Sequence, residues 1–472
     1  MFLLLAFCFL SAESGKFLVQ SIYGVGVMDR MKVLLIYPNQ PAVATQPPLG
    51  LMYIASCLRA GGHEPVIIEG NAEMIIDQFE TRWPCARVDF IGITCMSSMY
   101  QEILKIRDYF HTMDIPLIFG GVHATILPES LLSEDGDFND IVVQGEGEIT
   151  MLDIVNREFN ISGIYIQGEP VQNLDQLPFP ARDLVKKKYL KHSMSMLASR
   201  GCPFNCTFCQ PTLRKVFGAK VRRRSVGNVI DEMWLYYNSF HVTDFEFFDD
   251  TFTADKNWIH DFCEQIPHWA DWSWKALSRV DMLDFDMLKM MKEAGLTKLS
   301  LGIESGSQEI LNSYRKGISV EQAHQALEWC EHLGIKVHGF FMIGALEETR
   351  ETIQETRSFI RAHKFDTIFI TVTTPTPCTQ LYDRALKEGR LKVPWQQIDL
   401  LGSLTTTVHP KNLDQVVPMK LYHLAAEDVL RARYQILREF YLRKLRNPLY
   451  LWQFIRHNSL NYTWEAAKNV FH

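Results

Sequence analysis

Three cysteines lie close together in the stretch LASRGCPFNCTFCQ, residues 197–210. Cys202, Cys206 and Cys209 have C-x3-C-x2-C spacing, and no fourth cysteine follows closely. Iron–sulfur clusters and structural zinc sites normally take four protein ligands. Three thiolates on a four-iron cluster leave one iron with an open position, where a substrate or cofactor can bind. The spacing therefore predicts a catalytic cluster; zinc with a distant histidine as fourth ligand is the alternative.

The composition indicates the number of domains and argues against some classes of protein. At 472 residues the chain is too long for one ordinary core, so two or three domains are expected. A net charge of -7 gives no reason to expect nucleic acid as a partner. Ten cysteines are too few for a disulfide scaffold, and those outside the motif are expected to be small buried hydrophobes: Cys8, Cys57, Cys85, Cys95, Cys263, Cys330 and Cys378.

The first residues form an apolar run, MFLLLAFCFL, that is too short to span a bilayer. No Lys or Arg precedes it, unlike in a signal peptide. We interpret residues 1–30 as a leader or a misassigned start, with Met31 opening the first strand, and true export is the alternative. An oxygen-sensitive cluster favours the cytoplasm.

Residues 31–165 alternate short apolar strands with amphipathic helices. The strands are expected at 32–38, 64–70, 89–96, 115–121 and 140–148. Continuous apolar strands alternating with helices are typical of a parallel sheet covered on both faces. This predicts a doubly wound, Rossmann-like α/β domain. Ligands bind at the carboxyl ends of such strands, where the sequence has Gly120-Gly121 and the GEGE segment at 145–148.

A linker at 166–190 precedes a second alternation at 191–400. Its six strands are expected at 193–200, 243–250, 272–279, 297–305, 336–344 and 366–373. Six βα units predict a partial (βα)6 barrel with its chemistry at the carboxyl ends of the strands. The three cysteines follow the first of these strands, so we expect them at the catalytic mouth.

The cysteine motif, directly after the first strand of such a barrel, resembles the radical S-adenosylmethionine (SAM) enzymes. The resemblance implies a [4Fe-4S] cluster whose open iron holds SAM and an electron transfer that yields a 5'-deoxyadenosyl radical. Segments at the other strand ends are similar to the family's SAM-binding motifs and imply these residues: Asp249 and Asp250, Ser278 and Arg279, Glu304 and Ser305, and Ile343 with Gly344. As alternatives, Asp249 and Glu304 are helix N-caps, and Arg279 pairs with Asp281 or Asp284.

A doubly wound domain ahead of the barrel resembles the cobalamin-dependent subgroup. The segments PPLGLMYIASCLRAGGHEP, GGVHAT and VVQGEGE carry this likeness. It implies bound cobalamin contacted by the loop residues Gly120, Gly121, His123, Glu146 and Gly147. The chain lacks the D-x-H-x-x-G signature that supplies a cobalt-binding histidine, and His123 lies in a different loop. Loss of cobalamin from a degenerate domain is the alternative.

The resemblance implies either methyl transfer to an unactivated carbon or oxidative cyclisation. The layout is also similar to the anaerobic magnesium-protoporphyrin IX monomethyl ester cyclase type. A reductant such as flavodoxin or ferredoxin is implied. A non-catalytic iron–sulfur or cobalamin sensor is the alternative from another class, but it would leave the acidic barrel motifs without a role.

Residues 401–472 are expected to form a helical C-terminal domain. From 431 onward eight Lys or Arg stand against two Glu, with aromatic residues between them. This composition suits a large acidic or lipophilic small-molecule substrate, such as a tetrapyrrole or a polyprenoid, or peripheral contact with a membrane surface. The alternative is a capping helix with a solvated basic face.

Overall fold

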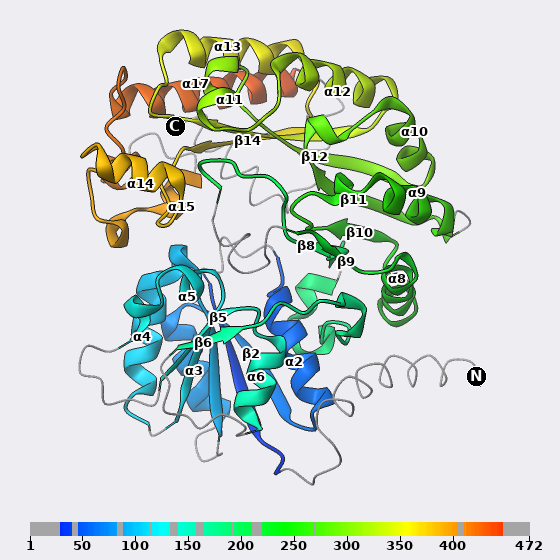
Figure 1. Ribbon diagram of the computed structural model, residues 1–472, viewed down its shortest axis with the longest axis vertical. Helices are drawn as coiled ribbons and strands as arrows, with labels where there is room; N and C mark the ends of the chain where they lie inside the picture. Colours follow the sequence, from blue (N-terminus) through cyan, green and yellow to red (C-terminus); the bar gives the residue numbers. More distant parts are fainter. Residues whose placement is uncertain are drawn as a thin grey trace. The chain divides into compact units, whose positions relative to one another are not determined.

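The computed structural model describes most of the chain in two compact units (Figure 1). The first, the N-terminal unit, comprises Met1–Pro203, Pro211–Asp250 and Trp269–Trp272; the second, the C-terminal unit, comprises Phe204–Gln210, Thr251–His268 and Ser273–His472. The described residues are 29–39, 46–82, 88–113, 115–132, 140–156, 165–190, 193–209, 220–267, 270–404, 410 and 412–446. Residues 1–28, with most of the predicted leader, lie outside them.

The N-terminal unit contains a parallel sheet with strand order β2-β1-β3-β4-β5-β6. The predicted doubly wound fold is thereby confirmed, and it has one strand more than the five we expected. The added strand, β6, is short and mostly accessible at the sheet edge, so it lacks the apolar run that marks the others. The strands are β1 (Lys32–Pro38), β2 (Glu64–Gly70), β3 (Phe90–Thr94), β4 (Leu117–Gly120), β5 (Ile141–Gly145) and β6 (Tyr165–Gly168).

Helices cover both faces of this sheet, which explains why strands such as β1 are buried over nearly their whole length. On one face α2 and α6 pack together and share a core with β1 and β5. On the other face α3 and α4 meet through the edge-to-face rings of Phe79 and Phe110. The helices are α2 (Leu49–Ala60), α3 (Ala72–Arg82), α4 (Tyr100–Phe110), α5 (Val122–Ile126) and α6 (Glu148–Val155).

The same unit holds the first two strands of the second alternation. Strand β7 (Met194–Met196) pairs in parallel with β10 (Asp244–Phe247). The predicted strand 193–200 is interrupted, because its last residues form β8 (Ser199–Arg200) and pair antiparallel with β9 (Arg222–Arg223). The three cysteines therefore lie in the chain between β8 and β9, rather than directly after the barrel strand β7.

The C-terminal unit continues with four parallel strands, β11 to β14, each paired with the next. Helix starts follow local capping rules: Ser319 and Gln322 form a capping box at α12, and Thr349 caps α13. The elements are α9 (Lys256–Gln265), β11 (Ser273–Ser278), α10 (Phe285–Glu293), β12 (Leu296–Glu304), α11 (Gln308–Ser313), α12 (Val320–His332), β13 (Lys336–Ile343), α13 (Arg350–Ala362) and β14 (Thr367–Val372).

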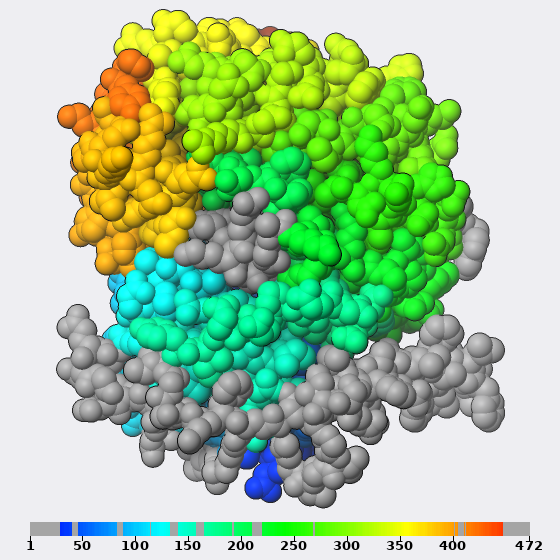
Figure 2. All heavy atoms as spheres, viewed as in Figure 1, coloured from blue at the N-terminus to red at the C-terminus, as the bar shows by residue number. Residues whose placement is uncertain are grey.

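The predicted helical C-terminal region is present as far as residue 446. Figure 2 shows orange residues of this region at the surface of the C-terminal unit. Helix α17 packs against α13 and β14. In the described part of the chain no helix is both long and apolar enough to cross a membrane. The remaining helices are α8 (Val226–Phe240) of the N-terminal unit, α14 (Gln380–Lys387), α15 (Leu400–Leu404), α16 (Leu413–Val416) and α17 (Ala426–Leu445).

Candidate active site

The motif cysteines differ from the other thiols in their exposure. Cys202, Cys206 and Cys209 are partly accessible and form no disulfide. The prediction that cysteines outside the motif are buried is confirmed for four of them. Burial raises the pKa of each of these thiols: Cys57, Cys95, Cys263 and Cys330. Cys378 is partly accessible instead, while Cys8 and Cys85 lie outside the described residues. Burial in apolar surroundings disfavours the thiolate form that binds a metal, so the partly accessible cysteines are the better candidates for ligands.

The segment carrying Cys206 and Cys209 is fixed by its backbone within the C-terminal unit. The amide of Thr207 donates to the carbonyl of Tyr314 at 2.9 Å, and its carbonyl accepts from the amide of Leu381 at 3.0 Å. The ring of Phe208 meets that of Tyr314 edge to face, with centroids 4.9 Å apart. The last two cysteines are thus placed by α11 and α14.

Arg279, at the end of β11, reaches this segment. Its guanidinium carbon lies 3.5 Å from the centroid of the Phe204 ring, and its Nη1 is 3.8 Å from the Sγ of Cys206. Its Nε and Nη2 each donate to Asp281 at 3.0 Å, which confirms the pairing with Asp281 considered from the sequence. The two interactions occur together, because the carboxylate orients the guanidinium while Nη1 faces the thiol.

Glu304 is connected to Arg279 through a residue that the sequence did not suggest. Arg279 Nη2 donates to the carbonyl of Lys316 at 2.6 Å, and Lys316 Nζ donates to Glu304 Oε1 at 2.8 Å. Glu304 has φ 69°, a left-handed conformation that costs a non-glycine residue energy and is often found at functional sites. It is not the N-cap of α11, which is Ser307. The only sequence signal for Lys316 is a lysine just after a helix.

The remaining predicted residues of the C-terminal unit are also buried. Ser278 is buried, with its Oγ 2.5 Å from that of Thr253. The hydroxyl of Ser305 bonds to Thr356 at 2.9 Å, inside the unit. Ile343 is fully buried at the end of β13. The hydroxyl of Ser278 also donates to the backbone carbonyl of Arg279 at 3.2 Å. The assignment of these three side chains to SAM stays a prediction.

The turn after β13 is held by Glu348, which sequence reasoning missed. Its Oε2 accepts from the amides of Gly344 at 3.1 Å and Ala345 at 3.4 Å, and its Oε1 accepts from Thr352 at 2.6 Å. Burial raises the pKa of Glu348 to about 7. Gly344 has φ 90°, so the turn needs a glycine there.

The acidic pair after β10 belongs to the N-terminal unit. Asp249 is fully buried; it accepts from the amide of Ala198 at 3.0 Å and from the hydroxyl of Ser199. It therefore fixes the start of β8, and it is not a helix N-cap, since α9 is capped by Asp255. Burial, with a smaller effect from Asp249, raises the pKa of Asp250 to about 6.

The loops at the carboxyl edge of the first sheet leave room for a ligand beside Gly120. A Cβ there would meet nothing within 4 Å, and Gly121 adopts φ 95°. His123 is fully buried, with its Nδ1 2.9 Å from the Ser97 hydroxyl and its Nε2 2.9 Å from that of Ser130. Burial lowers the pKa of His123 to about 4. Both ring nitrogens have partners inside the domain, so this histidine is poorly placed to bind cobalt.

Glu146 contacts arginines. Its carboxylate bonds to Arg222 and lies 3.4 Å from Nη1 of Arg200. Gly147 is the N-cap of α6. Sequence reasoning assigned both residues to cobalamin, and that assignment stays a prediction.

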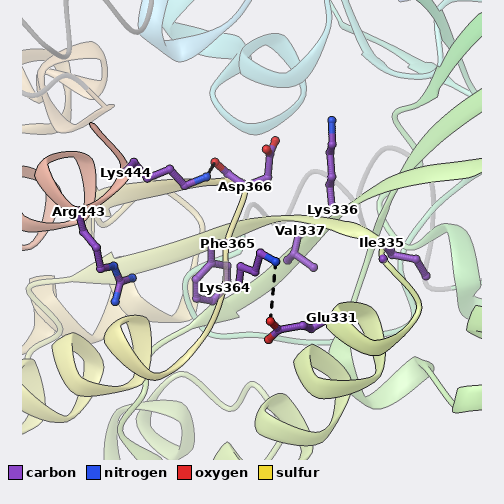
Figure 3. A pocket seen from close by; sticks show the side chains of 10 residues that line it. Glu331, Ile335, Lys336, Val337, Lys364, Phe365, Asp366, Arg443 and Lys444 are labelled. Carbon is purple, nitrogen blue, oxygen red and sulfur yellow. Dashed lines mark hydrogen bonds and ion pairs between the residues drawn. The ribbon is translucent and has the colours of Figure 1, made fainter. Parts of the chain in front are cut away.

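A cavity of about 450 Å³ lies at the opposite, amino-terminal end of β13 and β14 (Figure 3). Its lining includes Arg443 and Lys444 from α17. Arg443 donates to the carbonyl of Arg361 at 2.8 Å, and Lys444 to that of Asp366 at 2.5 Å. These two cations thus hold α17 against backbone away from the cysteine segment.

Comparison with known proteins is consistent with this arrangement. Residues 41–155 match the B12 binding domain, and residues 196–360 match the Radical SAM superfamily. An uncharacterized methyltransferase of Pyrococcus horikoshii is 32% identical over 454 residues, which cover 88% of this chain and 94% of that protein. The chain belongs to the radical SAM superfamily, in the group with a B12-binding domain.

Three further proteins are similar to this chain at lower sequence identity. The anaerobic magnesium-protoporphyrin IX monomethyl ester cyclase of Rubrivivax gelatinosus is 28% identical, covering 75% of this chain and 69% of that protein. The cobalamin-dependent SAM radical enzyme OxsB, solved with aqua-cobalamin and SAM, shares the fold with a TM-score of 0.67 at 16% identity, covering 98% of this chain and 77% of that one. The methyltransferase TsrM from Kitasatospora setae has a TM-score of 0.63 at 17% identity, covering 76% and 78%.

The residues present fit the cofactors of this family. Three accessible thiols, one beside a guanidinium, suit a [4Fe-4S] cluster with a position open for SAM. The glycine loops at the first sheet's carboxyl edge suit close backbone contact with cobalamin, held without His123 at the cobalt. These are the cofactors that the sequence implied.

Proposed function

We propose that this radical SAM enzyme transfers a methyl group to an unactivated carbon of a large organic substrate. When bound, the cluster supplies the electron that cleaves SAM, and cobalamin supplies the methyl group. The observation that carries the proposal is the connected set of Arg279, Lys316 and Glu304 beside Cys206. A 32%-identical relative named as a methyltransferase supports the reaction type.

The chain's own residues orient SAM in this proposal. Arg279, fixed by Asp281 and stacked on Phe204, offers its Nη1 to the SAM carboxylate. Glu304, fixed by Lys316, offers its carboxylate to the SAM amine. The aromatic rings of Phe204 and Phe208 exclude water from the cluster segment. Oxidative cyclisation is the second candidate, and its support is the likeness to the Rubrivivax gelatinosus cyclase.

For the substrate we propose a tetrapyrrole or a polyprenoid, on the basis of the basic and aromatic composition of the C-terminal region. Arg443 and Lys444 do not add to this, since their side chains bind backbone carbonyls of the C-terminal unit. A flavodoxin or ferredoxin is the proposed reductant. Arg456 and Lys468 lie outside the described residues, so membrane contact rests on composition alone.

The test uses protein reconstituted anaerobically with iron, sulfide and cobalamin, then reduced with SAM present. Release of 5'-deoxyadenosine is expected, and a sensor would release none. Isotopically labelled SAM is then supplied with tetrapyrrole and polyprenoid candidates. Label in a new C–CH3 group supports methyl transfer, whereas an unlabelled product with an added ring shows cyclisation instead.

A further inference from the structure

Two arginines pair across the ribbon that leads into the cysteine motif. Arg200 on β8 and Arg222 on β9 are direct partners. Cys202 follows Arg200 by two residues and belongs to the same unit. The position of the ribbon therefore determines where the cysteine motif begins.

Both arginines bind carboxylates of the GEGE segment that follows β5. Glu146 bonds to Arg222 and lies 3.4 Å from Arg200, and Glu148 accepts from Arg200 at 2.5 Å. The guanidinium carbon of Arg200 also lies 5.3 Å from the centroid of the Tyr53 ring on α2. The ribbon is thus held by the first sheet and its helices, all within the N-terminal unit.

Glu146 joins both arginines to the backbone of Val171. Its Oε2 accepts from the amide of Val171 at 2.7 Å, while Arg222 donates to the carbonyl of that residue. The side chains of Glu146, Arg200 and Arg222 are 1%, 8% and 7% exposed. Hydrogen-bonded ions this deeply buried keep one geometry, because a displaced charge would be left without a partner.

We infer that Glu146 is a positioning residue for the iron–sulfur cluster: through Arg200 and Arg222 it fixes the ribbon strand that leads into Cys202. A carboxylate at the cobalamin-domain edge then acts on the cluster rather than on cobalamin. This inference rests on the family's cluster and SAM, and it does not depend on which carbon is methylated. Its failure is therefore separable from failure of the proposed function.

The test compares Glu146→Gln with wild type in three measurements on the reconstituted protein. We expect unchanged cobalt uptake, an altered electron paramagnetic resonance signal of the reduced cluster, and SAM binding weakened at least about tenfold, since small misplacements in a reacting site are costly. The matched control is Asp140→Asn. Asp140 is also a buried carboxylate, paired with His111 at 2.9 Å, but it precedes β5 at the opposite end of that strand. The control should bind SAM normally.

Two results would overturn the inference. One is a folded Glu146→Gln protein with wild-type SAM affinity and cluster signal. The other is loss of cobalt uptake with a normal cluster signal, which would make Glu146 a cobalamin contact. If Glu146→Gln does not fold, the double variant Glu146→Gln/Arg222→Gln removes both charges and leaves neither unpaired. The same three measurements and the same two overturning results then apply to it.

Discussion

Two interpretations of Arg279 were open from the sequence: an ion pair with Asp281, and the binding of the SAM carboxylate that the family likeness implied. The ion pair is present, and Nη1 of Arg279 lies 3.8 Å from the Sγ of Cys206. A short-range pair is visible in a sequence because the two residues are two positions apart. The contact with Cys206 joins residues 73 positions apart, so the sequence did not suggest it.

Replacing Arg279 with lysine tests this double role. Lysine keeps the charge but loses the planar fork that binds Asp281 and stacks on Phe204. We expect SAM affinity to fall at least about tenfold with iron content near wild type. Equilibrium dialysis with the reconstituted protein measures this. The control, Arg357→Lys, changes a partly exposed arginine on α13 and should bind SAM normally; equal loss in both variants would contradict the role.

Replacing Cys206 with alanine should abolish release of 5'-deoxyadenosine and lower the iron content, because two thiolates do not hold a four-iron cluster. Cys263→Ala, which alters a buried thiol on α9, should keep both. Iron analysis and chromatography of the quenched reaction give the readouts. Full SAM cleavage by Cys206→Ala would remove this cysteine from the ligand set.

The raised pKa of Glu348 leads us to expect that the stability of the protein depends on pH. Its pKa rises from 4.5 to about 7 in the folded protein, so folding favours the protonated form. The stabilisation is complete below pH 4.5 and is lost as the pH rises towards 7. Unfolding of apo wild type and Glu348→Gln at pH 5 and pH 8 should show wild type losing stability relative to the variant at the higher pH. A constant difference would argue against a raised pKa.

At the scale of elements, apolar periodicity predicted most of the strands. β1 and β2 have the expected bounds, since buried parallel strands are unbroken apolar runs. β6 was missed because an accessible edge strand has no such run, and β8 because its ribbon depends on pairing with β9. Neither signal is local, so single-sequence reasoning does not find it.

Helix α17 is attached to its unit both by a buried aromatic ring and by ion pairs near the surface, and the two contributions to stability can be measured separately. Phe440 is 2% exposed, whereas Glu439 pairs with Arg357 and Arg361 near the surface. We expect Phe440→Ala to lower the free energy of unfolding by about 3–5 kcal/mol and Glu439→Gln by less than about 1 kcal/mol. Denaturant unfolding measures both. Similar losses would mean that the ion pairs, rather than the packing, hold this helix.

At the scale of the whole molecule, the cofactors could be predicted from the sequence but the substrate could not. The sequence implied a cluster, SAM and cobalamin by likeness, and the family matches support all three. The substrate could not be predicted, because its contacts depend on loops and a C-terminal region whose composition is informative only about broad chemistry. The contacts of Glu146 could not be predicted from the sequence either, because its arginine partners are 54 and 76 positions away in the chain.

Metal analysis of the reconstituted protein tests whether the chain binds both the iron–sulfur cluster and cobalamin. We expect about four irons per chain and one cobalt. The Cys206→Ala control should keep the cobalt and lose iron, because the two cofactors are held by different segments. Iron without cobalt would reduce the first domain to a scaffold.

The β8–β9 ribbon has a consequence for how this chain can vary. Arg200 and Arg222 pair across the ribbon, so the chain that joins them is closed into a loop. The entropy of closing a loop grows slowly, by about 0.6 kcal/mol for each doubling of its length. We therefore expect the ribbon to persist in relatives whose two paired residues are separated by a longer chain.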